Sequence, residues 1–423
     1  MRLYNTLSRR LEELPPPPGP IRMYFCGPTV YARAHVGNAI PFVLPMWLRT
    51  WLRTRGYDVT FVHNITDIND KIYDAAPGKS AELAAQATEW YLQDTADLGL
   101  GMPDLMPRAT ETIPQIVAFI EKLIDRDFAY AVGGDVYFRV ARDPGYGRLS
   151  RQKPDQMVEE EPSAAKEAPQ DFALWKATKP GEDTSWDSPW GRGRPGWHIE
   201  CSVMAEEAFG PMFEIHGGGL DLVFPHHENE LAQSRALGHE FARIWMHNGM
   251  LQFTGEKMSK SLGNITTIRE ALDEYGRETL LLFFMSGHWR KPLDYSETTM
   301  AQAAAQVERL RNVFRAPSEP VGDWAAFEEA LDDDFNTPEA LALLHGWRDH
   351  ELLRRGLEIF GLGSLAEVAE APPHIVSLAE QRQTAREAGD FAGADRLRAE
   401  IAAAGWEVRD IDEPPGFLLV PKS

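Results

Sequence analysis

The feature that most constrains this chain is a strand, a turn, a helix and a second strand close to its start. Residues 21–26 alternate as a strand does, and a Gly-Pro pair then breaks the pattern. Residues 37–55 carry apolar side chains at near-helical spacing, and the β-branched stretch 58–65 predicts another strand. Such a βαβ unit builds a parallel sheet, in which ligands bind at the carboxyl ends of the strands. The turn over 27–37 is therefore the first candidate site.

Further α/β elements follow this unit, but their order weakens in the middle of the chain. The next predicted elements are two helices and a short strand, at 80–98, 110–127 and 135–140. Residues 151–196 are rich in Pro, Glu, Lys and Gly and predict an irregular insertion, although 171–175 could dock on another element. The α/β pattern resumes at residue 197, so the first domain is expected to be split. From residue 298 onward, Ala, Leu, Glu and Arg dominate, which is typical of helices.

Charge and hydropathy exclude several classes of protein. The 423 residues include 43 Lys and Arg against 64 Asp and Glu, a net charge of −21. This balance argues against tight, sequence-independent binding to nucleic acid, so a nucleic-acid partner would need local basic or shape-complementary patches. No apolar run reaches the roughly 18 residues of a membrane span, and the first 20 residues lack the apolar core of a secretory signal. We expect a cytoplasmic protein with no membrane partner.

Two cysteines and a His-Glu pair form a candidate metal site. His226 and Glu230 are four residues apart and share one face of a predicted helix, where an imidazole and a carboxylate can bind one ion. Together with Cys26 and Cys201 they offer a donor set that suits tetrahedral zinc. The alternatives are a solvated helix face with chance histidines, and cysteines buried as small apolar side chains.

A second candidate site combines two lysines with a distant turn. Lys257 and Lys260 lie one turn apart in a Gly-flanked segment that could close on phosphates. His35 and Asn38 follow the first strand, at a predicted helix N-terminus that favours an anion. The alternatives are a solvated lysine pair and a histidine that only caps the turn.

Seven ordered motifs show what this chain resembles. They are CGPTVY (26–31), HVGN (35–38), NITD (64–67), PGWHIEC (195–201), HGGG (216–219), FPHHENE (224–230) and KMSKSLGN (257–264). On these motifs the chain resembles the cysteinyl-tRNA synthetases, which are class I aminoacyl-tRNA synthetases. The resemblance implies an α/β fold with a Rossmann-like catalytic domain split by an insertion, plus a C-terminal all-α helical domain.

The resemblance also implies boundaries for these parts. The expected units are a catalytic domain with a zinc site (1–98 and 190–250), an insertion domain (99–189), a signature-loop stem domain (251–310) and a reduced helical anticodon-binding domain (311–423). The sequence does not determine the oligomeric state, for which we favour a monomer.

The resemblance assigns roles to the residues already singled out. Cys26, Cys201, His226 and Glu230 would hold one zinc ion, which binds the thiolate of the substrate L-cysteine. A thiolate binds zinc far better than a serine hydroxyl does, so the metal could select cysteine. The amino acid would also lie against four residues at matching family positions: Gly27, Thr66, Trp197 and His216. His216 could instead be a structural turn residue.

ATP, accompanied by Mg²⁺, would be the second substrate and tRNA(Cys) the acceptor. His35, Asn38, Lys257 and Lys260 would hold the phosphates while the cysteine carboxylate attacks the α-phosphorus, so positioning and charge would carry the catalysis. In the C-terminal region four residues match anticodon-contacting positions: Arg386, Phe391, Asp395 and Asp410. For each of these four, a surface charge or a core aromatic is the alternative.

Five positions depart from what the family usually has, and two rival functions also stay open. These positions are Ala32, Ile40, Pro45, Met46 and Asn69, which we expect to cluster around the nucleotide and tRNA-end pocket, with Pro45 kinking its helix. One rival is a ligase that passes activated cysteine to a small amine. The other is a catalytically weakened paralogue that only binds RNA or nucleotide.

Overall fold

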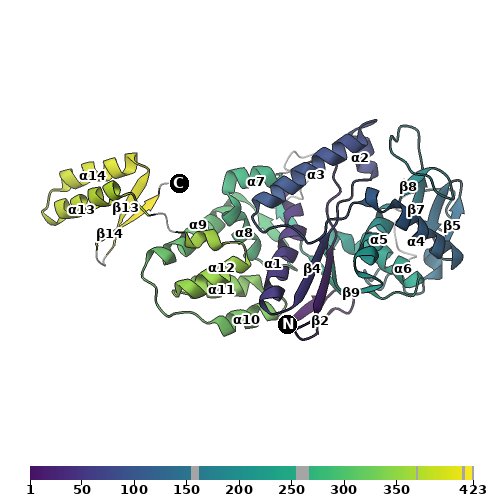
Figure 1. Ribbon diagram of the computed structural model, residues 1–423, viewed down its shortest axis with the longest axis horizontal. Helices are drawn as coiled ribbons and strands as arrows, with labels where there is room; N and C mark the ends of the chain where they lie inside the picture. The colour runs from purple at the N-terminus through teal and green to yellow at the C-terminus, as the bar shows by residue number, and fades with distance from the viewer. Residues whose placement is uncertain (154–161, 254–265, 368–369, 412–414, 422–423) are drawn as a thin grey trace.

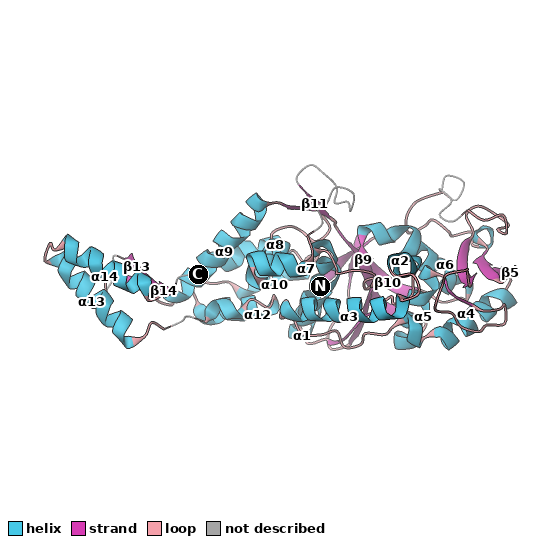
Figure 2. Ribbon diagram, turned by 90° about the horizontal axis from the view of Figure 1, so that it is seen from above, coloured by secondary structure: helices cyan, strands magenta, loops and turns pink. Residues whose placement is uncertain are grey.

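The computed structural model of the chain shows an elongated molecule with the parallel sheet near its middle (Figure 1). It describes residues 1–153, 162–253, 266–367, 370–411 and 415–421. A second sheet lies at one end of the long axis and a small C-terminal unit at the other. Figure 2 shows the same arrangement after a quarter turn.

The central sheet has four parallel strands in the order β10-β9-β3-β4. Their bounds are β3 Pro20–Phe25, β4 Asp58–His63, β9 Met212–Gly219 and β10 Phe241–Asn248. The strands predicted over 21–26 and 58–65 are thus confirmed within one or two residues. Because β9 pairs directly with β3, chain segments nearly 200 residues apart end at the same edge of the sheet. An additional hairpin, β1 (Arg2–Asn5) and β2 (Arg10–Glu13), precedes the sheet.

The predicted crossover helix follows β3 and contains three of the five departures from the family's usual residues. A short 3₁₀ turn, η1 (Val36–Ala39), leads into α1 (Ile40–Thr54), which continues through Pro45 as one helix. Ile40 and Met46 are both buried in the main hydrophobic core, because α1 is buried on most of its circumference. These two departures therefore contribute to packing and do not line the reactive cavity, contrary to the clustering that we expected. Helices α2 (Asp70–Ala75) and α3 (Ser80–Asp97) follow β4.

The insertion contains a second sheet, which is antiparallel. Its strands are β5 (Ala129–Val132), β6 (Asp135–Phe138), β7 (Phe172–Ala177) and β8 (Gly193–Pro195), with α4 (Ile113–Asp125) beside them. The prediction of an irregular 151–196 segment is therefore wrong at two places. Strand β7 forms on the edge of β6, and β8 (Gly-Arg-Pro), whose residues have low strand preference, forms on the edge that β7 offers.

Helix α5 (Trp197–Phe209) returns the chain from the insertion to strand β9 of the central sheet. Helix α6 (Glu228–Ala236) then connects β9 to β10. The chain continues through β11 (Leu251–Phe253), α7 (Ile268–Tyr275), α8 (Arg277–Met285) and β12 (Leu293–Tyr295), and β11 pairs with β12.

The C-terminal region is helical, as predicted, and is built in two parts. Helices α9 to α12 belong to the same hydrophobic core as the sheet, with Trp47 of α1 packed edge-on against Phe360. Their bounds are α9 Glu297–Arg315, α10 Trp324–Asp332, α11 Thr337–Gly346 and α12 His350–Ile359. No helix in the part of the chain described above is both long and apolar enough to cross a bilayer.

The last part is a small module with its own core. It consists of α13 (Pro373–Glu387), α14 (Phe391–Ala403) and an antiparallel hairpin, β13 (Trp406–Asp410) and β14 (Phe417–Pro421). Its core comprises Ile375, Ala379, Ile401, Val408 and Phe417. The hairpin adds two strands that the helical composition did not predict, and the small core is separate from the main one.

Candidate active site and metal-binding cluster

A cavity of about 290 Å³ lies at the carboxyl edge of the central sheet, where the strand–turn–helix pattern placed the first candidate site. Residues after β3 form one wall, and the ends of β9 and β10 form another. Five predicted site residues line this cavity: Cys26, Gly27, His35, Asn38 and Trp197. A parallel sheet gathers these residues because its strands all end at this edge.

The turn around His35, which follows β3, is hydrogen-bonded to the chain just beyond the two lysines. The backbone N–H of Val36 donates to Thr266 (2.9 Å), and Ile268 N–H donates to Ala34 (2.9 Å). Lys257 and Lys260 themselves lie outside the described residues. The described chain resumes at residue 266, and these two hydrogen bonds place residues 266–268 beside the HVGN turn.

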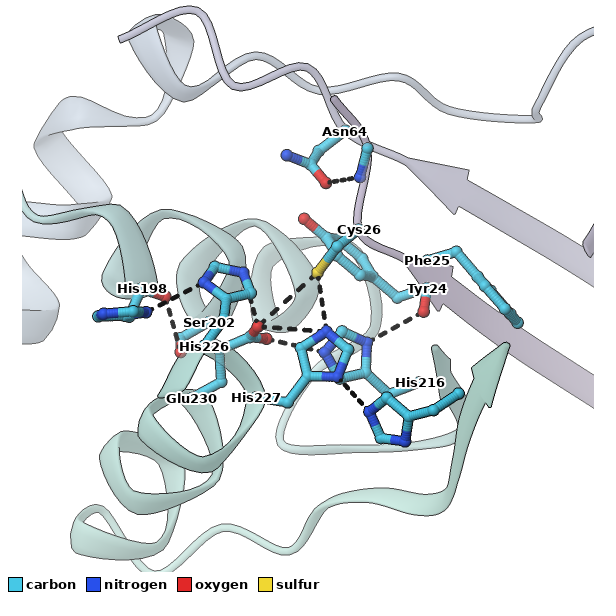
Figure 3. A network of polar contacts seen from close by, with 12 residues as sticks. Tyr24, Phe25, Cys26, Asn64, His198, Ser202, His216, His226, His227 and Glu230 are labelled. Carbon is cyan, nitrogen blue, oxygen red and sulfur yellow. Dashed lines mark hydrogen bonds and ion pairs between the residues drawn. The ribbon is translucent and has the colours of Figure 1, made fainter. Parts of the chain in front are cut away.

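The candidate metal cluster lies at the end of β3 (Figure 3), and its residue Cys26 also lines this cavity. The thiol of Cys26, the imidazoles of His226 and His227 and the carboxylate of Glu230 have ligand atoms within 4.8 Å of one another. All four residues are buried. Cys26 Sγ is 3.3 Å from His227 Nε2 and 3.7 Å from Glu230 Oε1. Buried thiol, imidazole and carboxylate groups are the ligand types that bind zinc in proteins, so this set fits a zinc ion.

Cys201 lies against the same cluster from α5. Its thiol interacts electrostatically with Cys26 and His226, but Cys201 is not one of the four residues whose ligand atoms lie within 4.8 Å of one another; His227 takes that place. The hydrogen bond with Cys26 and the nearby His226 lower the pKa of the Cys201 thiol to about 6, although burial opposes this shift. Burial instead raises the pKa of Cys26 well above its usual value. A low thiol pKa favours the thiolate, which is the form that binds metal.

The carboxylate of Glu230 is held in one orientation. His216 Nε2 lies 2.8 Å from Oε2, whereas His226 Nε2 lies 3.0 Å from Oε1. His216 is fixed in turn by the backbone oxygen of Tyr24, 3.0 Å from its Nδ1. Burial disfavours the charged form of Glu230, but the two histidines outweigh it and lower the pKa to about 2. Oε1 of Glu230 is the oxygen that faces the thiol of Cys26.

Burial also opposes a charge on His226, yet Glu230 and Cys201 raise its pKa to about 10. Without a metal, the cluster therefore holds a buried ion pair between His226 and Glu230. A buried charge needs such a partner, because desolvation of an isolated ion costs several kcal/mol.

Sequence reasoning did not assign three histidines that surround this cluster. His227 faces Cys26 and is 2.7 Å from His247, which contacts Thr6 at 2.8 Å; His198 is 3.0 Å from His226. His227 caps the N-terminus of α6, three residues before Glu230, so the same helical-face argument that selected His226 could have found it.

The predicted amino-acid site contains one aromatic wall and one close backbone approach. The indole of Trp197 stacks on His226 with ring centroids 4.3 Å apart. A Cβ on Gly27 would lie 1.7 Å from the backbone oxygen of Asn64, so only glycine fits there. Thr66 is buried, and its N–H donates to Pro28 (3.0 Å). Thr66 therefore stabilises the turn through its backbone hydrogen bond to Pro28, and its side chain does not line the cavity.

Two of the remaining departures have local explanations. Ala32 lines the cavity, so this is the one of the five that changes its surface directly. Asn69 caps α2, and its side chain accepts a hydrogen bond from Lys71 N–H at 3.1 Å. An aspartate would cap the same helix equally well, because both side chains are strong N-caps.

The four anticodon candidates all lie in the terminal module. Arg386 is on α13 and forms an ion pair with Asp410, the last residue of β13; Asp410 also accepts from Arg382 (2.7 Å). Phe391 begins α14 and is 67% exposed, which leaves its ring available for stacking. Asp395 lies one helical turn further along α14.

Comparisons with known proteins agree with this geometry. Residues 15–305 match the family of tRNA synthetases class I (C) catalytic domains, and residues 326–349 match the DALR domain. The cysteine–tRNA ligase of Alkalilimnicola ehrlichii is 44% identical over 97% of this chain and 98% of its own length. That of Pseudothermotoga lettingae is 42% identical over 99% of both chains. The solved structure of Mycobacterium tuberculosis methionyl-tRNA synthetase with methionyl-adenylate shares the fold, at a TM-score of 0.59 and 14% identity over 90% of this chain and 88% of its own.

Proposed function

This chain belongs to the cysteine–tRNA ligases, a family of class I aminoacyl-tRNA synthetases, and from that premise we propose that it activates L-cysteine with ATP and transfers it to tRNA(Cys). The observation that carries the proposal is the buried cluster of thiols, imidazoles and a carboxylate beside the cavity that contains the HVGN turn. The cluster would bind the thiol of the substrate, and the turn would bind ATP next to it.

We propose Cys26, Cys201, His226 and Glu230 as the ligands of one zinc ion per chain. When bound, zinc supplies a site that prefers a thiolate to a hydroxyl, so cysteine is selected over serine. His216 orients Glu230 through the 2.8 Å contact at Oε2, as groups outside the ligand shell of a metal commonly do. Trp197, stacked on His226, closes the amino-acid end of the cavity and excludes water.

The first step is adenylate formation. A carboxylate oxygen of cysteine forms a bond to the α-phosphorus of ATP, the bond to the β-phosphate bridge breaks, and pyrophosphate leaves with Mg²⁺ as its counterion. His35 and Asn38 lie at the start of η1, where backbone N–H groups favour an anion. Lys257 and Lys260, at the family's signature positions, would neutralise the charge that grows on the leaving phosphates.

In the second step a terminal ribose hydroxyl of the tRNA attacks the adenylate carbonyl, and AMP leaves. The exposed ring of Phe391 is suited to stack on an anticodon base, with Arg386, Asp395 and Asp410 contacting neighbouring groups. We place the reaction in the cytoplasm, where ATP and tRNA are available, and we retain the four domain boundaries and the monomer as predictions.

The direct test is cysteine-dependent exchange of pyrophosphate into ATP, followed in the same preparation by transfer of labelled cysteine to tRNA. We expect both activities, and serine should support neither at the same concentration. Exchange without transfer to tRNA would favour a ligase with a small-molecule acceptor. Failure of exchange in zinc-loaded protein would contradict the proposal and favour a binding paralogue.

A further inference from the structure

The peptide group that leads into Cys26 is held from both neighbouring strands. Strand β3 ends at Phe25, and Cys26 is the first residue beyond it. The N–H of Cys26 donates to the backbone oxygen of Gly217 in β9 at 3.0 Å. On the other side, Nδ1 of His63, the last residue of β4, lies 3.0 Å from the backbone oxygen of Phe25. The N–H and the C=O of one peptide group are thus both fixed, and this group carries the Cα of Cys26.

The peptide group that follows Cys26 is held as well. The N–H of Gly27 donates to Oδ1 of Asn64 at 2.8 Å (Figure 3). Nδ2 of Asn64 donates to the Thr66 hydroxyl at 3.2 Å, which fixes the end of the amide that faces Gly27. His63 and Asn64 are consecutive and buried, so the end of β4 holds the backbone before and after Cys26.

The partners of His63 determine which of its ring nitrogens carries the hydrogen. A backbone oxygen only accepts, so Nδ1 carries the hydrogen and donates to Phe25. Nε2 of the neutral ring then accepts, and the hydroxyl of Tyr91 donates to it at 2.6 Å. Burial lowers the pKa of His63 to about 4, so the ring stays neutral at physiological pH. Tyr91, on α3, thereby holds the imidazole in the tautomer that donates to Phe25.

Packing also fixes the imidazole of His63, which is 1% exposed. Phe42 of α1 meets it edge-on with ring centroids 5.9 Å apart, and the rings of Phe61 and Tyr91 lie at 5.8 and 5.9 Å. Among the residues that the structure describes, the ligand atoms that come together at the metal cluster do not include those of His63. His63 therefore reaches the cluster only through the backbone that it holds.

We propose that His63 is a positioning residue for the metal ligand Cys26. Its hydrogen bond to the Phe25 oxygen sets the plane of the peptide group before Cys26, and with it the direction of the thiol. Metal–ligand distances tolerate only about 0.2 Å, so a small rotation of this peptide group weakens zinc binding. The inference rests on the function proposed above, because zinc held by Cys26 would bind the substrate thiol.

Two substitutions separate the two nitrogens of the imidazole. In His63→Asn the amide nitrogen takes the place of Nδ1 and can still donate to Phe25, whereas in His63→Gln it takes the place of Nε2 and this donor is lost. His63→Gln should weaken zinc binding about 10- to 100-fold, the usual effect of losing a group that orients a metal ligand. His63→Asn should keep most of the wild-type affinity, although its smaller side chain leaves a cavity and should lower stability more.

His345→Gln is the remote control. His345 lies 3.2 Å from Gln306 in the C-terminal helices, so its loss should leave zinc binding unchanged. Zinc affinity is measured on the full chain by dialysis against buffered zinc followed by elemental analysis, and stability by urea unfolding of the metal-free chain.

A positioning role predicts opposite orders in these two measurements. Zinc affinity should fall most in His63→Gln, and stability should fall most in His63→Asn. The same order in both measurements, equal losses of zinc affinity in the two variants, or wild-type affinity in His63→Gln would overturn the proposal. If His63→Asn does not fold, His63→Gln is compared with His345→Gln, and equal zinc affinities overturn it.

Exchange kinetics give a second readout. His63→Gln should raise the KM for L-cysteine and leave the KM for ATP unchanged, because zinc would bind only the amino acid. A rise in both KM values would show a general distortion of the site and contradict a role confined to Cys26. Absence of cysteine-dependent exchange in the wild type would instead refute the proposed function, and the zinc measurements do not depend on that activity.

Discussion

Gly27→Ala should disrupt the metal site and the catalytic turn by a steric route. The added Cβ would lie 1.7 Å from the backbone oxygen of Asn64 and 2.8 Å from its carbonyl carbon. Ordinary contact for a Cβ begins at 3.4 Å, so one strand end must move by about 1.7 Å. Both obstructing atoms belong to the backbone at the end of β4, which cannot rotate away as a side chain would.

The strain can be accommodated in two ways, and each has a measurable magnitude. If the backbone at the ends of β3 and β4 does not move, overpacking should lower the free energy of unfolding by about 3 kcal/mol, the upper part of the usual range. If the end of β3 moves instead, Cys26 moves with it. Metal–ligand distances tolerate about 0.2 Å, and misplacement of reacting groups by about 1 Å can reduce a rate roughly 100-fold. We therefore expect loss of bound zinc together with at least this loss of exchange activity.

Three measurements on one preparation test this prediction. They are urea unfolding followed by the fluorescence of the chain's 12 tryptophans, zinc content by elemental analysis, and cysteine-dependent pyrophosphate exchange. Gly346→Ala is the control, because a Cβ there meets nothing within 4 Å and this variant should behave as wild type. Wild-type stability, zinc content and exchange in Gly27→Ala would refute the argument from close approach.

Three further predictions concern the metal, the phosphates and pH. Cys201→Ser should lose bound zinc, measured by elemental analysis; retained zinc would instead favour His227 as the fourth ligand. Lys260→Ala should lower the kcat of adenylate formation by about 100-fold or more, and near wild-type turnover would remove its phosphate role. Burial disfavours ionised Glu214, but hydrogen bonds from Arg22 outweigh it and lower its pKa. Its contribution to stability is therefore complete above about pH 4.5 and is lost as pH falls through the lower folded-state pKa. Glu214→Gln should flatten this acid limb of urea unfolding midpoints against pH, and an unchanged limb would contradict the assignment.

Local patterns in the sequence predicted the elements around the site well. The first βαβ unit was predictable because strand and helix periodicities are read within a few residues, and Gly27 marked where the strand ends. The helical spacing of His226 and Glu230 predicted that they face each other; His226 lies in the turn before α6 and Glu230 in α6, and the structure brings them within 3.0 Å. Cys26 and Cys201 became candidates from donor chemistry and from the resemblance, since no local pattern joins residues so far apart.

Other features depended on partners that a local pattern does not contain. Strands β7 and β8 and the terminal hairpin form because a neighbouring strand completes their hydrogen bonds. Ile40 and Met46 proved to be core residues, because α1 packs against the central strands on one side and against α12 of the C-terminal region.

The sequence by itself thus determined the parallel α/β class, the order of the motifs and the donor types available for a metal. Only the tertiary structure decided which of these donors meet. Cys26 and His227, 201 positions apart, lie 3.3 Å from each other because β9 pairs with β3 and α6 follows β9. The same packing sets His216 on the far oxygen of Glu230 and places the insertion beside Trp197. Periodicity acts over a few residues, whereas a binding site requires side chains that only strand pairing and core packing bring together.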